Sequence, residues 1–138
     1  MMKKEVEFDN MEFGLDHNFI HCKFKGKLNK TFLQLDMEDI IIEVVPTLSE
    51  INYKPIIFDL TQISKVDAFR VFKILSRNSN IKLLVLSKSF LVKSFDLKLL
   101  FDLCSFKCGA VVPNKVFTSY NQSVKFCSKD YEQFNACY

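Results

Sequence analysis

Apolar and polar positions near the N-terminus follow the two-residue period of β-strands. In residues 19–24 two unlike sets of side chains alternate, as expected of a strand whose two faces meet different surroundings. Residues 11–15 also have extended character, and the turn-forming Asp-His-Asn sequence at 16–18 separates the two runs. The pattern predicts an antiparallel hairpin at the start of the domain.

Farther along the chain, helical patterns alternate with buried-strand patterns. Apolar residues at steps of three and four predict helices, and residues such as Asn29 and Asp67 can cap their N-termini. Runs that are apolar almost throughout, at 56–58 and 81–86, predict neighbouring parallel strands covered on both faces. Pro46 is expected to kink or end the first helix. In chain order, the sequence predicts strands at 11–15, 19–24, 56–58, 81–86 and 110–117, and helices at 30–45, 68–77, 90–106 and 119–127.

This order of elements predicts the fold class. Strands separated by helices after one initial hairpin are typical of an α/β domain with a mixed, mostly parallel sheet flanked by helices. The 138 residues fit a single domain, with a core over about residues 11–127 and a polar C-terminal tail at 128–138 that could dock or fray. The expected core residues are Phe24, Ile57, Phe58, Leu60, Phe72, Leu75, Leu84 and Val116.

Composition excludes several classes of protein. Apolar residues make up 49% of the chain and charged residues 25%, which is close to the globular average and excludes a disordered or collagen-like chain. Three glycines, at 14, 26 and 109, cannot build the glycine-rich phosphate loops of nucleotide enzymes. The net charge of +3 is too small to predict nucleic-acid binding.

Targeting features and cysteine usage predict the compartment. We find no leader-like apolar segment near residue 1 and no run approaching the roughly 18 apolar residues of a membrane span. We therefore expect a cytoplasmic protein without a transmembrane segment. The five cysteines are an odd number without secretory context, so we expect reduced thiols rather than disulfides.

Three short motifs, in this order and spacing, resemble those of the STAS family. Residues 24–29 (FKGKLN) resemble the family's F-x-G-x-L-D motif, and residues 57–67 (IFDLTQISKVD) resemble its strand that ends in D-L-S and continues to a second Asp. Residues 116–119 (VFTS), followed by Val124, resemble the closing strand and helix of the SpoIIAA-like branch. The resemblance covers roughly residues 13–127. The STAS family includes domains of sulfate transporters and the anti-sigma-factor antagonists.

The resemblance implies a fold and a role. It implies a STAS-like (SpoIIAA-like) sheet and a non-enzymatic regulatory module that needs no cofactor and binds a protein partner through the loop after residue 61 and the following helix. In the antagonists the second Asp precedes a phosphorylatable Ser or Thr and then Ser-Gly. Here Asp67 precedes Ala68, Phe69 and Arg70, and Ala68 has no hydroxyl group to accept phosphate. We therefore expect the module to lack the serine phospho-switch.

Two interpretations of the loop and helix remain open. In the first, a partner contacts the loop and a stripe of cations that falls on one helical face by its i, i+3, i+7 spacing. In the second, Asp67 only caps the helix and the cations are its ordinary solvated exterior. The candidate partner-binding residues are Ser64, Lys65, Asp67, Phe69, Arg70, Lys73 and Arg77.

The segment 90–106 is apolar over more than half of its helical circumference. Such a helix should bury more than one side, either in a homodimer or against an apolar ligand, although plain packing in the core also accounts for it. The candidate residues for a dimer or ligand surface are Leu91, Phe95 and Leu99. A small apolar-ligand or lipid-binding protein of the same fold is therefore the alternative function.

Catalytic and metal-binding signatures are weak. His17 and His21 are too far apart along a strand to share an ion unless the hairpin turn folds one back. Cys104 and Cys108 are one pair without the second pair that zinc spacings normally bring. We expect no metal site and no enzymatic activity.

Overall fold

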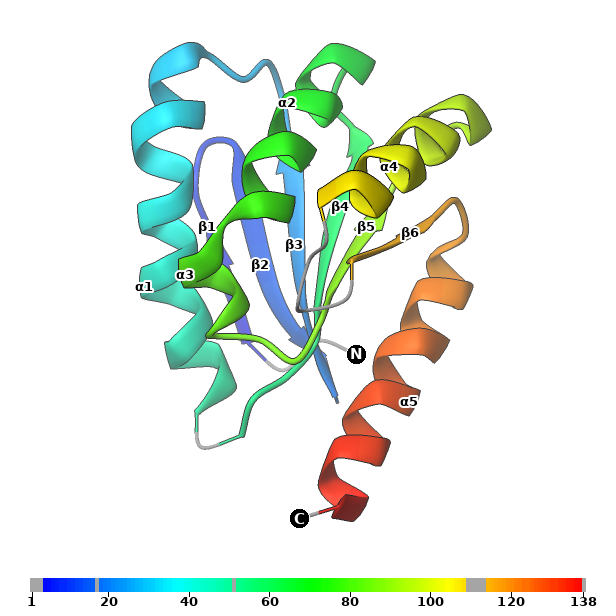
Figure 1. The fold of residues 1–138 in the computed structure, drawn as a ribbon. Helices are drawn as coiled ribbons and strands as arrows, with labels where there is room; N and C mark the ends of the chain where they lie inside the picture. Colours follow the sequence, from blue (N-terminus) through cyan, green and yellow to red (C-terminus); the bar gives the residue numbers. More distant parts are fainter. Residues whose placement is uncertain (1–3, 17, 51, 109–113, 138) are drawn as a thin grey trace.

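A mixed sheet forms the centre of the protein (Figure 1). The computed structural model describes residues 4–16, 18–50, 52–108 and 114–137. The strands of these residues make one six-stranded sheet in the order β1-β2-β3-β4-β5-β6. They are β1 (Lys4–Glu7), β2 (Met11–Asp16), β3 (Phe19–Lys25), β4 (Ile56–Gln62), β5 (Lys88–Leu91) and β6 (Asn114–Phe117). β2 is antiparallel to β1 and β3, whereas β3, β4, β5 and β6 are parallel, which confirms the predicted α/β class.

Helices cover both faces of the sheet. They are the π-helix η1 (Phe32–Asp36), α1 (Met37–Ser49), α2 (Lys65–Arg77), α3 (Ser79–Lys82), α4 (Phe95–Cys108) and α5 (Tyr120–Cys137). The alternation in β4 assigns the faces, because Phe58 joins the main core with α1, α2 and α4, whereas Ile57 joins a smaller cluster with Cys127 of α5. Figure 1 shows α1, α2 and α4 together in front of the sheet and α5 apart from them.

Phenylalanine fills the main core. The Phe72 ring stacks on Phe101 at 4.1 Å between centroids and meets the edge of Phe90 at 4.7 Å. Phe90 stacks in turn on Phe58 at 5.3 Å, which joins α2 and α4 to the two central strands. Seven of the eight predicted core residues are buried, and Leu84 is partly buried.

The strand predicted at 81–86 is wrong. Ile81 lies in α3, and the strand that pairs with β4 is β5, at Lys88–Leu91. Asn78 accounts for the difference, because its Oδ1 accepts a hydrogen bond from Ile81 N at 2.8 Å and begins a new helical turn. The predicted helix at 90–106 accordingly starts later, at Phe95.

Other boundaries also differ from the prediction. β1 precedes the predicted hairpin, and α1 continues through Pro46 to Ser49. The polar tail docks as the second half of α5, which extends to Cys137. The predicted final strand is described only as β6, because its first part, 110–113, lies outside the described residues.

Candidate functional site

The loops that follow β3, β4 and β5 meet around the first turn of α2. Parallel strands place these loops at one edge of the sheet, where open α/β sheets usually bind their ligands. Lys93 Nζ, in the β5–α4 loop, donates to the Ile63 carbonyl in the β4–α2 loop at 2.8 Å. Lys65 of α2 pairs with Asp96 of α4, with 3.0 Å between Nζ and Oδ2. The candidate loop is therefore fixed to its neighbours.

Ser64 and Asp67 have structural roles within this loop. Ser64, not Asp67, is the N-cap of α2, and its Oγ accepts from Asp67 N at 3.1 Å. Asp67 is buried, and its Oδ2 accepts from Leu28 N at 3.2 Å, which ties the β3–η1 connection to α2. The other carboxylate oxygen lies 3.7 Å from Arg70 Nη1. Asp67 therefore affects the exposed face of α2 only through its contact with Arg70.

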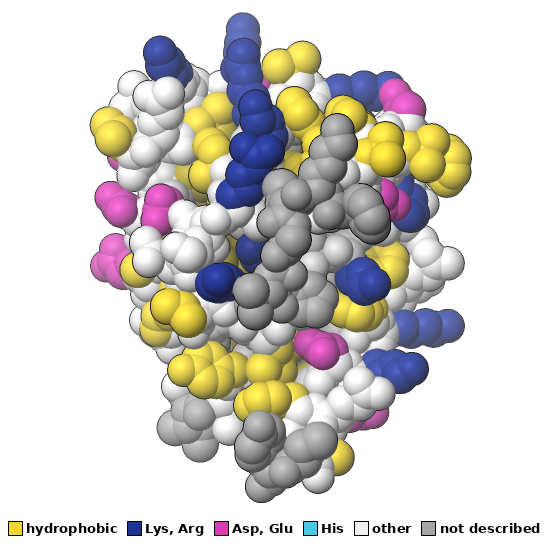
Figure 2. Space-filling view, viewed as in Figure 1, with side chains coloured by type: hydrophobic (Ala, Val, Ile, Leu, Met, Phe, Trp, Pro, Cys, Tyr) yellow, Lys and Arg dark blue, Asp and Glu magenta, His cyan; other side chains and the backbone are white. Residues whose placement is uncertain are grey.

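The cation stripe predicted from sequence lies on the solvent side of α2. Arg70, Lys73 and Arg77 are exposed, as are Ser64 and Lys65. Phe69 is half-buried, and the centroid of its ring lies 6.3 Å from that of Phe101. Lys73 Nζ lies 5.5 Å from the centroid of the Phe69 ring. Figure 2 shows a row of Lys and Arg side chains over the part of this face where α2 lies in Figure 1.

Two cations of this stripe, Arg70 and Lys73, line a groove between η1 and α2. Its volume is about 480 Å³, and its charged groups all carry positive charge. The lining residues are Lys30, Leu33, Gln34, Arg70, Lys73 and Ile74. Of these lining residues, the sequence predicted only Arg70 and Lys73 of α2 as candidate binding residues. The other wall of the groove comes from residues 30–34, which only the fold brings close to α2. We call this site the cationic groove.

A second groove, between the β1–β2 turn and the η1–α1 segment, has the opposite charge. Its volume is about 450 Å³, and its lining carries four carboxylates and no Lys or Arg. These are Asp9, Asp36, Asp39 and Glu43, and Phe8, Phe32 and Ile40 supply apolar surface. An acidic ligand is therefore attracted to one of the two grooves and repelled from the other.

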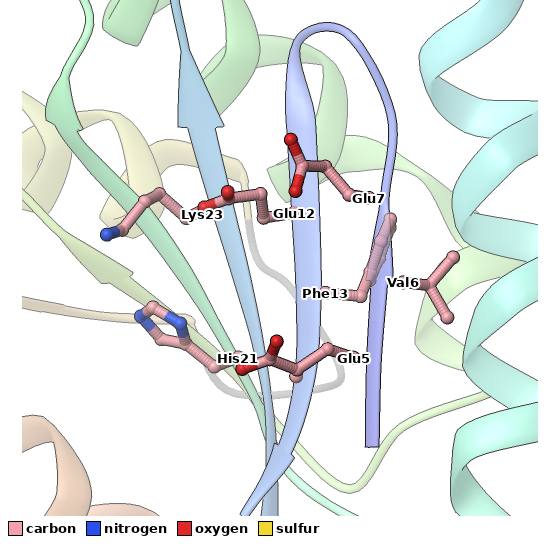
Figure 3. Close-up of a pocket in the computed structure, with 8 residues that line it drawn as sticks. Glu5, Val6, Glu7, Glu12, Phe13, His21 and Lys23 are labelled. Atoms are coloured by element: carbon pink, nitrogen blue, oxygen red, sulfur yellow. The ribbon is translucent and has the colours of Figure 1, made fainter.

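The hairpin strands enclose a smaller hollow of about 100 Å³ (Figure 3). Small-molecule pockets are usually about 300–1,000 Å³, so this hollow is too small for such a ligand.

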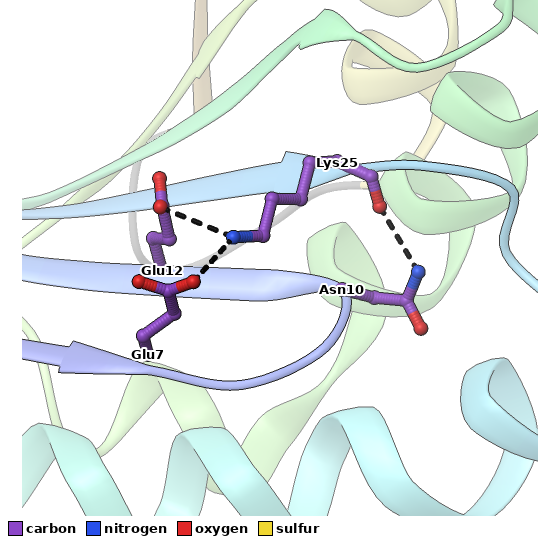
Figure 4. Close-up of polar contacts among 4 residues, drawn as sticks. All are labelled: Glu7, Asn10, Glu12 and Lys25. Atoms are coloured by element: carbon purple, nitrogen blue, oxygen red, sulfur yellow. Dashed lines mark hydrogen bonds and ion pairs between the residues drawn. The ribbon is translucent and has the colours of Figure 1, made fainter.

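Lys25 lies at the end of β3 and donates to Glu7 at 2.9 Å and to Glu12 at 3.1 Å (Figure 4). These hydrogen bonds raise the pKa of Lys25. Asn10 Nδ2 donates to the Lys25 carbonyl at 3.0 Å, so this end of the hairpin is held by its own polar groups.

Titratable groups on the α5 side of the sheet are buried and paired. His21 Nε2 lies 3.5 Å from Asp59 Oδ2, and Asp59 Oδ1 accepts from Thr61 Oγ1 at 2.6 Å. Burial raises the pKa of Asp59, but the contact with His21 and the hydrogen bonds from Thr61 outweigh burial and hold the pKa below its usual value. The two buried thiols lie on opposite faces of the sheet, with Cys127 in the α5-side cluster and Cys22 in the main core. Burial raises the pKa of the Cys22 thiol, and that of the Cys127 thiol to about 12. At neutral pH both thiols are therefore protonated, which is unlike an activated nucleophile.

Neither a metal-ligand cluster nor a membrane-spanning helix is present in the described part of the chain. Within it, no three His, Cys, Asp or Glu side chains are grouped to hold a metal ion. His17 and the Cys108 side chain, weighed as ligands from the sequence, lie outside what the structure describes. None of the described helices is both long and apolar enough to span a bilayer.

The three residues predicted for a dimer or ligand surface separate in the structure. Leu91 does not belong to it, because it lies in β5, is 5% exposed and packs in the cluster under α5. The sequence placed it on a helix that in fact begins at Phe95. Phe95 and Leu99 of α4 are 66% and 50% exposed, and Leu100 and Leu103 are exposed beside them.

Comparison with known proteins supports the fold. Neither a protein-family model nor a curated protein sequence matches the chain. The chain is similar to the crystal structure of an uncharacterized protein of the DUF3478 family from Shewanella loihica PV-4, described as having a SpoIIAA-like fold. The match has a TM-score of 0.55 at 12% sequence identity and covers 90% of this chain and 98% of the other. The protein therefore has the SpoIIAA-like fold that the motifs predicted.

Proposed function

We propose that this protein is a non-enzymatic regulatory module that binds an acidic segment of a partner protein in the cationic groove. The groove itself is the observation that carries the proposal. Lys30, Arg70 and Lys73 surround it, and Leu33 and Ile74 give it apolar surface. A segment with carboxylates beside an apolar residue matches this lining in both charge and polarity.

Two of the three cations already contact neighbouring groups of the protein before a partner arrives. Arg70 is attracted to the buried carboxylate of Asp67, and Lys73 lies over the Phe69 ring. Ordering a flexible side chain on binding costs roughly 0.5–1.5 kcal/mol, so positioned cations bind at a smaller entropic cost. An open, charged groove also predicts association that weakens as salt is added.

Regulation by a phosphate on α2 is not part of the proposal. Ala68 stands where the antagonists carry the phosphorylated hydroxyl, and its side chain is 0% exposed. Ser64 is the nearest hydroxyl before it, and its oxygen is used to cap α2. Control of binding would therefore act on the partner or on its availability.

Affinity capture with a matched charge control tests the proposal. The full chain is used to capture proteins from an extract of the source organism, alongside the double variants Arg70→Glu/Lys73→Glu and Lys125→Glu/Lys129→Glu. The second variant makes the same charge change at exposed lysines of α5, away from the groove. We expect the wild type and the α5 variant to retain a partner that the groove variant loses.

Two results would contradict the proposal. One is a partner retained equally by both double variants, since it would bind outside the cationic groove. The other is a lipid or other apolar molecule copurifying with the folded chain in native mass spectrometry, without dependence on Arg70 and Lys73. That result would favour a small-ligand protein of the same fold. Cross-linking the captured partner to Lys30 and sequencing the linked peptide shows directly whether that segment is acidic.

A further inference from the structure

The outer face of α4 carries an apolar stripe that the fold leaves in water. Phe95, Leu99 and Leu103 follow one another at four-residue steps and are 66%, 50% and 64% exposed. Leu100 lies beside them and is 41% exposed. The opposite side of the helix faces the core through Leu97 and Phe101, which are buried. In Figure 2 hydrophobic side chains gather over the region that α4 occupies in Figure 1.

Charged residues beside this stripe occur in pairs of opposite sign. Lys98 Nζ lies 2.6 Å from Asp102 Oδ2, and both side chains are partly exposed along one edge of the stripe. Lys65 and Asp96 form a second exposed pair at the start of α4. These pairs have no net charge, so they do not attract the stripe to an anionic lipid surface. A border with both signs suits a surface that must be complementary to itself.

The spacing of these residues fits an antiparallel pair of α4 helices. When a twofold axis passes level with Leu100, each Lys98 faces Asp102 of the second copy along the same edge. An α-helix rises about 1.5 Å per residue. Along the shared axis, Phe95, Leu99 and Leu103 of one helix therefore alternate with the same residues of the other at steps of about 3 Å, and the two Leu100 residues lie at the centre. Neither helix has to place a large side chain directly opposite an identical one in this series.

We propose that the stripe on α4 is the interface of a twofold homodimer in which two α4 helices pack antiparallel. The occupant is a second copy of this chain, and the contact is an apolar seam bordered by reciprocal Lys98–Asp102 pairs. The cationic groove lies on the other side of α2, between it and η1, and remains open in such a dimer. This inference is therefore independent of the proposed function.

Sedimentation velocity of the full chain under reducing conditions tests the interface. We expect a dimer at concentrations up to about 100 μM and a dissociation constant at least about tenfold weaker for Leu103→Asp. The matched control is Leu35→Asp, since Leu35 lies on η1 and is 63% exposed, against 64% for Leu103. The control should dimerise like the wild type, and circular dichroism should show all three chains folded.

Charge reversal tests the antiparallel register. In Asp102→Lys, Lys98 of each copy faces the new lysine at position 102 of the other copy. This repulsion should weaken the dimer. The double variant Lys98→Asp/Asp102→Lys restores opposite charges across the twofold axis and should restore the dimer.

Three outcomes would overturn the proposal. The first is a wild type that stays monomeric over the whole concentration range, and the second is a dimer unaffected by Leu103→Asp. The third is a monomer that binds neutral phospholipid vesicles through the stripe, which would make a membrane its occupant. Failure of the double charge reversal to rescue Asp102→Lys would overturn the antiparallel register.

Discussion

Asp67 shows how one buried carboxylate connects the loop, the helix and the cationic groove. Its backbone N–H completes the cap on Ser64, one oxygen holds Leu28 N, and the other attracts Arg70. The motif around residues 57–67 predicted that this residue matters, with capping and partner binding left as alternatives. Sequence could not predict the bond to Leu28, because that contact depends on how the β3–η1 connection packs against α2.

Replacing Asp67 by Ala should lower the free energy of unfolding by about 1–3 kcal/mol, because Leu28 N loses its acceptor in a buried place. Asp96→Ala provides the matched control, since the Lys65–Asp96 pair is exposed and is worth at most about 1 kcal/mol. Urea unfolding followed by circular dichroism measures both. Equal losses in the two variants would show that the Asp67 contact carries no special weight.

At the level of elements, the polarity of β5 explains the largest error of the sequence prediction. β5 begins with Lys88 and Ser89, which are 1% and 0% exposed, and neither has the character of a buried strand residue. The preceding apolar run at 81–86 looked more like a strand, but Asn78 caps a helical turn there. Lys88 is tolerated inside because its Nζ donates to the carbonyls of Leu75 and Ser76 at the end of α2.

Lys88 should make stability depend on pH in the alkaline range. Burial lowers its pKa to about 8, with a smaller contribution from Lys82, whereas an unfolded lysine titrates near 10.4. Between these values the unfolded chain binds more protons, so this group makes the folded state more stable as pH rises. Between pH 7 and pH 10.5, the free energy of unfolding of the wild type should rise by up to about 3 kcal/mol relative to that of Lys88→Met.

Urea unfolding of both chains at several pH values gives this difference and cancels the other titrating groups. A difference that stays constant over the range would mean that Lys88 keeps an ordinary pKa in the folded protein. A difference that shrinks with pH would mean that the charged ammonium group is stabilised by the two carbonyls more than burial disfavours it.

For the whole molecule, local patterns predicted the fold better than the site. The order of strands and helices follows from periodicity along the chain, and the stripe of Arg70, Lys73 and Arg77 follows from helical spacing within α2. The cationic groove has a second wall at Lys30 and Leu33, so it exists only once η1 packs beside α2. Such a site cannot be found from the spacing of residues within either segment.

The two faces of the sheet should differ in stability. The main core joins three helices to the strands, whereas the smaller cluster under α5 contains Phe19, Ile57, Leu91 and Cys127. A helix held by fewer buried contacts opens at a lower free energy than the global transition. We therefore expect α5 to detach before the main core unfolds.

Cys127 and Cys22 provide matched probes of this opening. Both thiols are fully buried. Cys127 of α5 lies against Ser89 of β5, and Cys22 of β3 lies in the main core. Pulses of N-ethylmaleimide at increasing urea, read by peptide mass spectrometry, should label Cys127 at lower urea than Cys22. Simultaneous labelling of both thiols, along the transition seen by circular dichroism, would instead show that α5 unfolds in one cooperative unit with the sheet and its other helices.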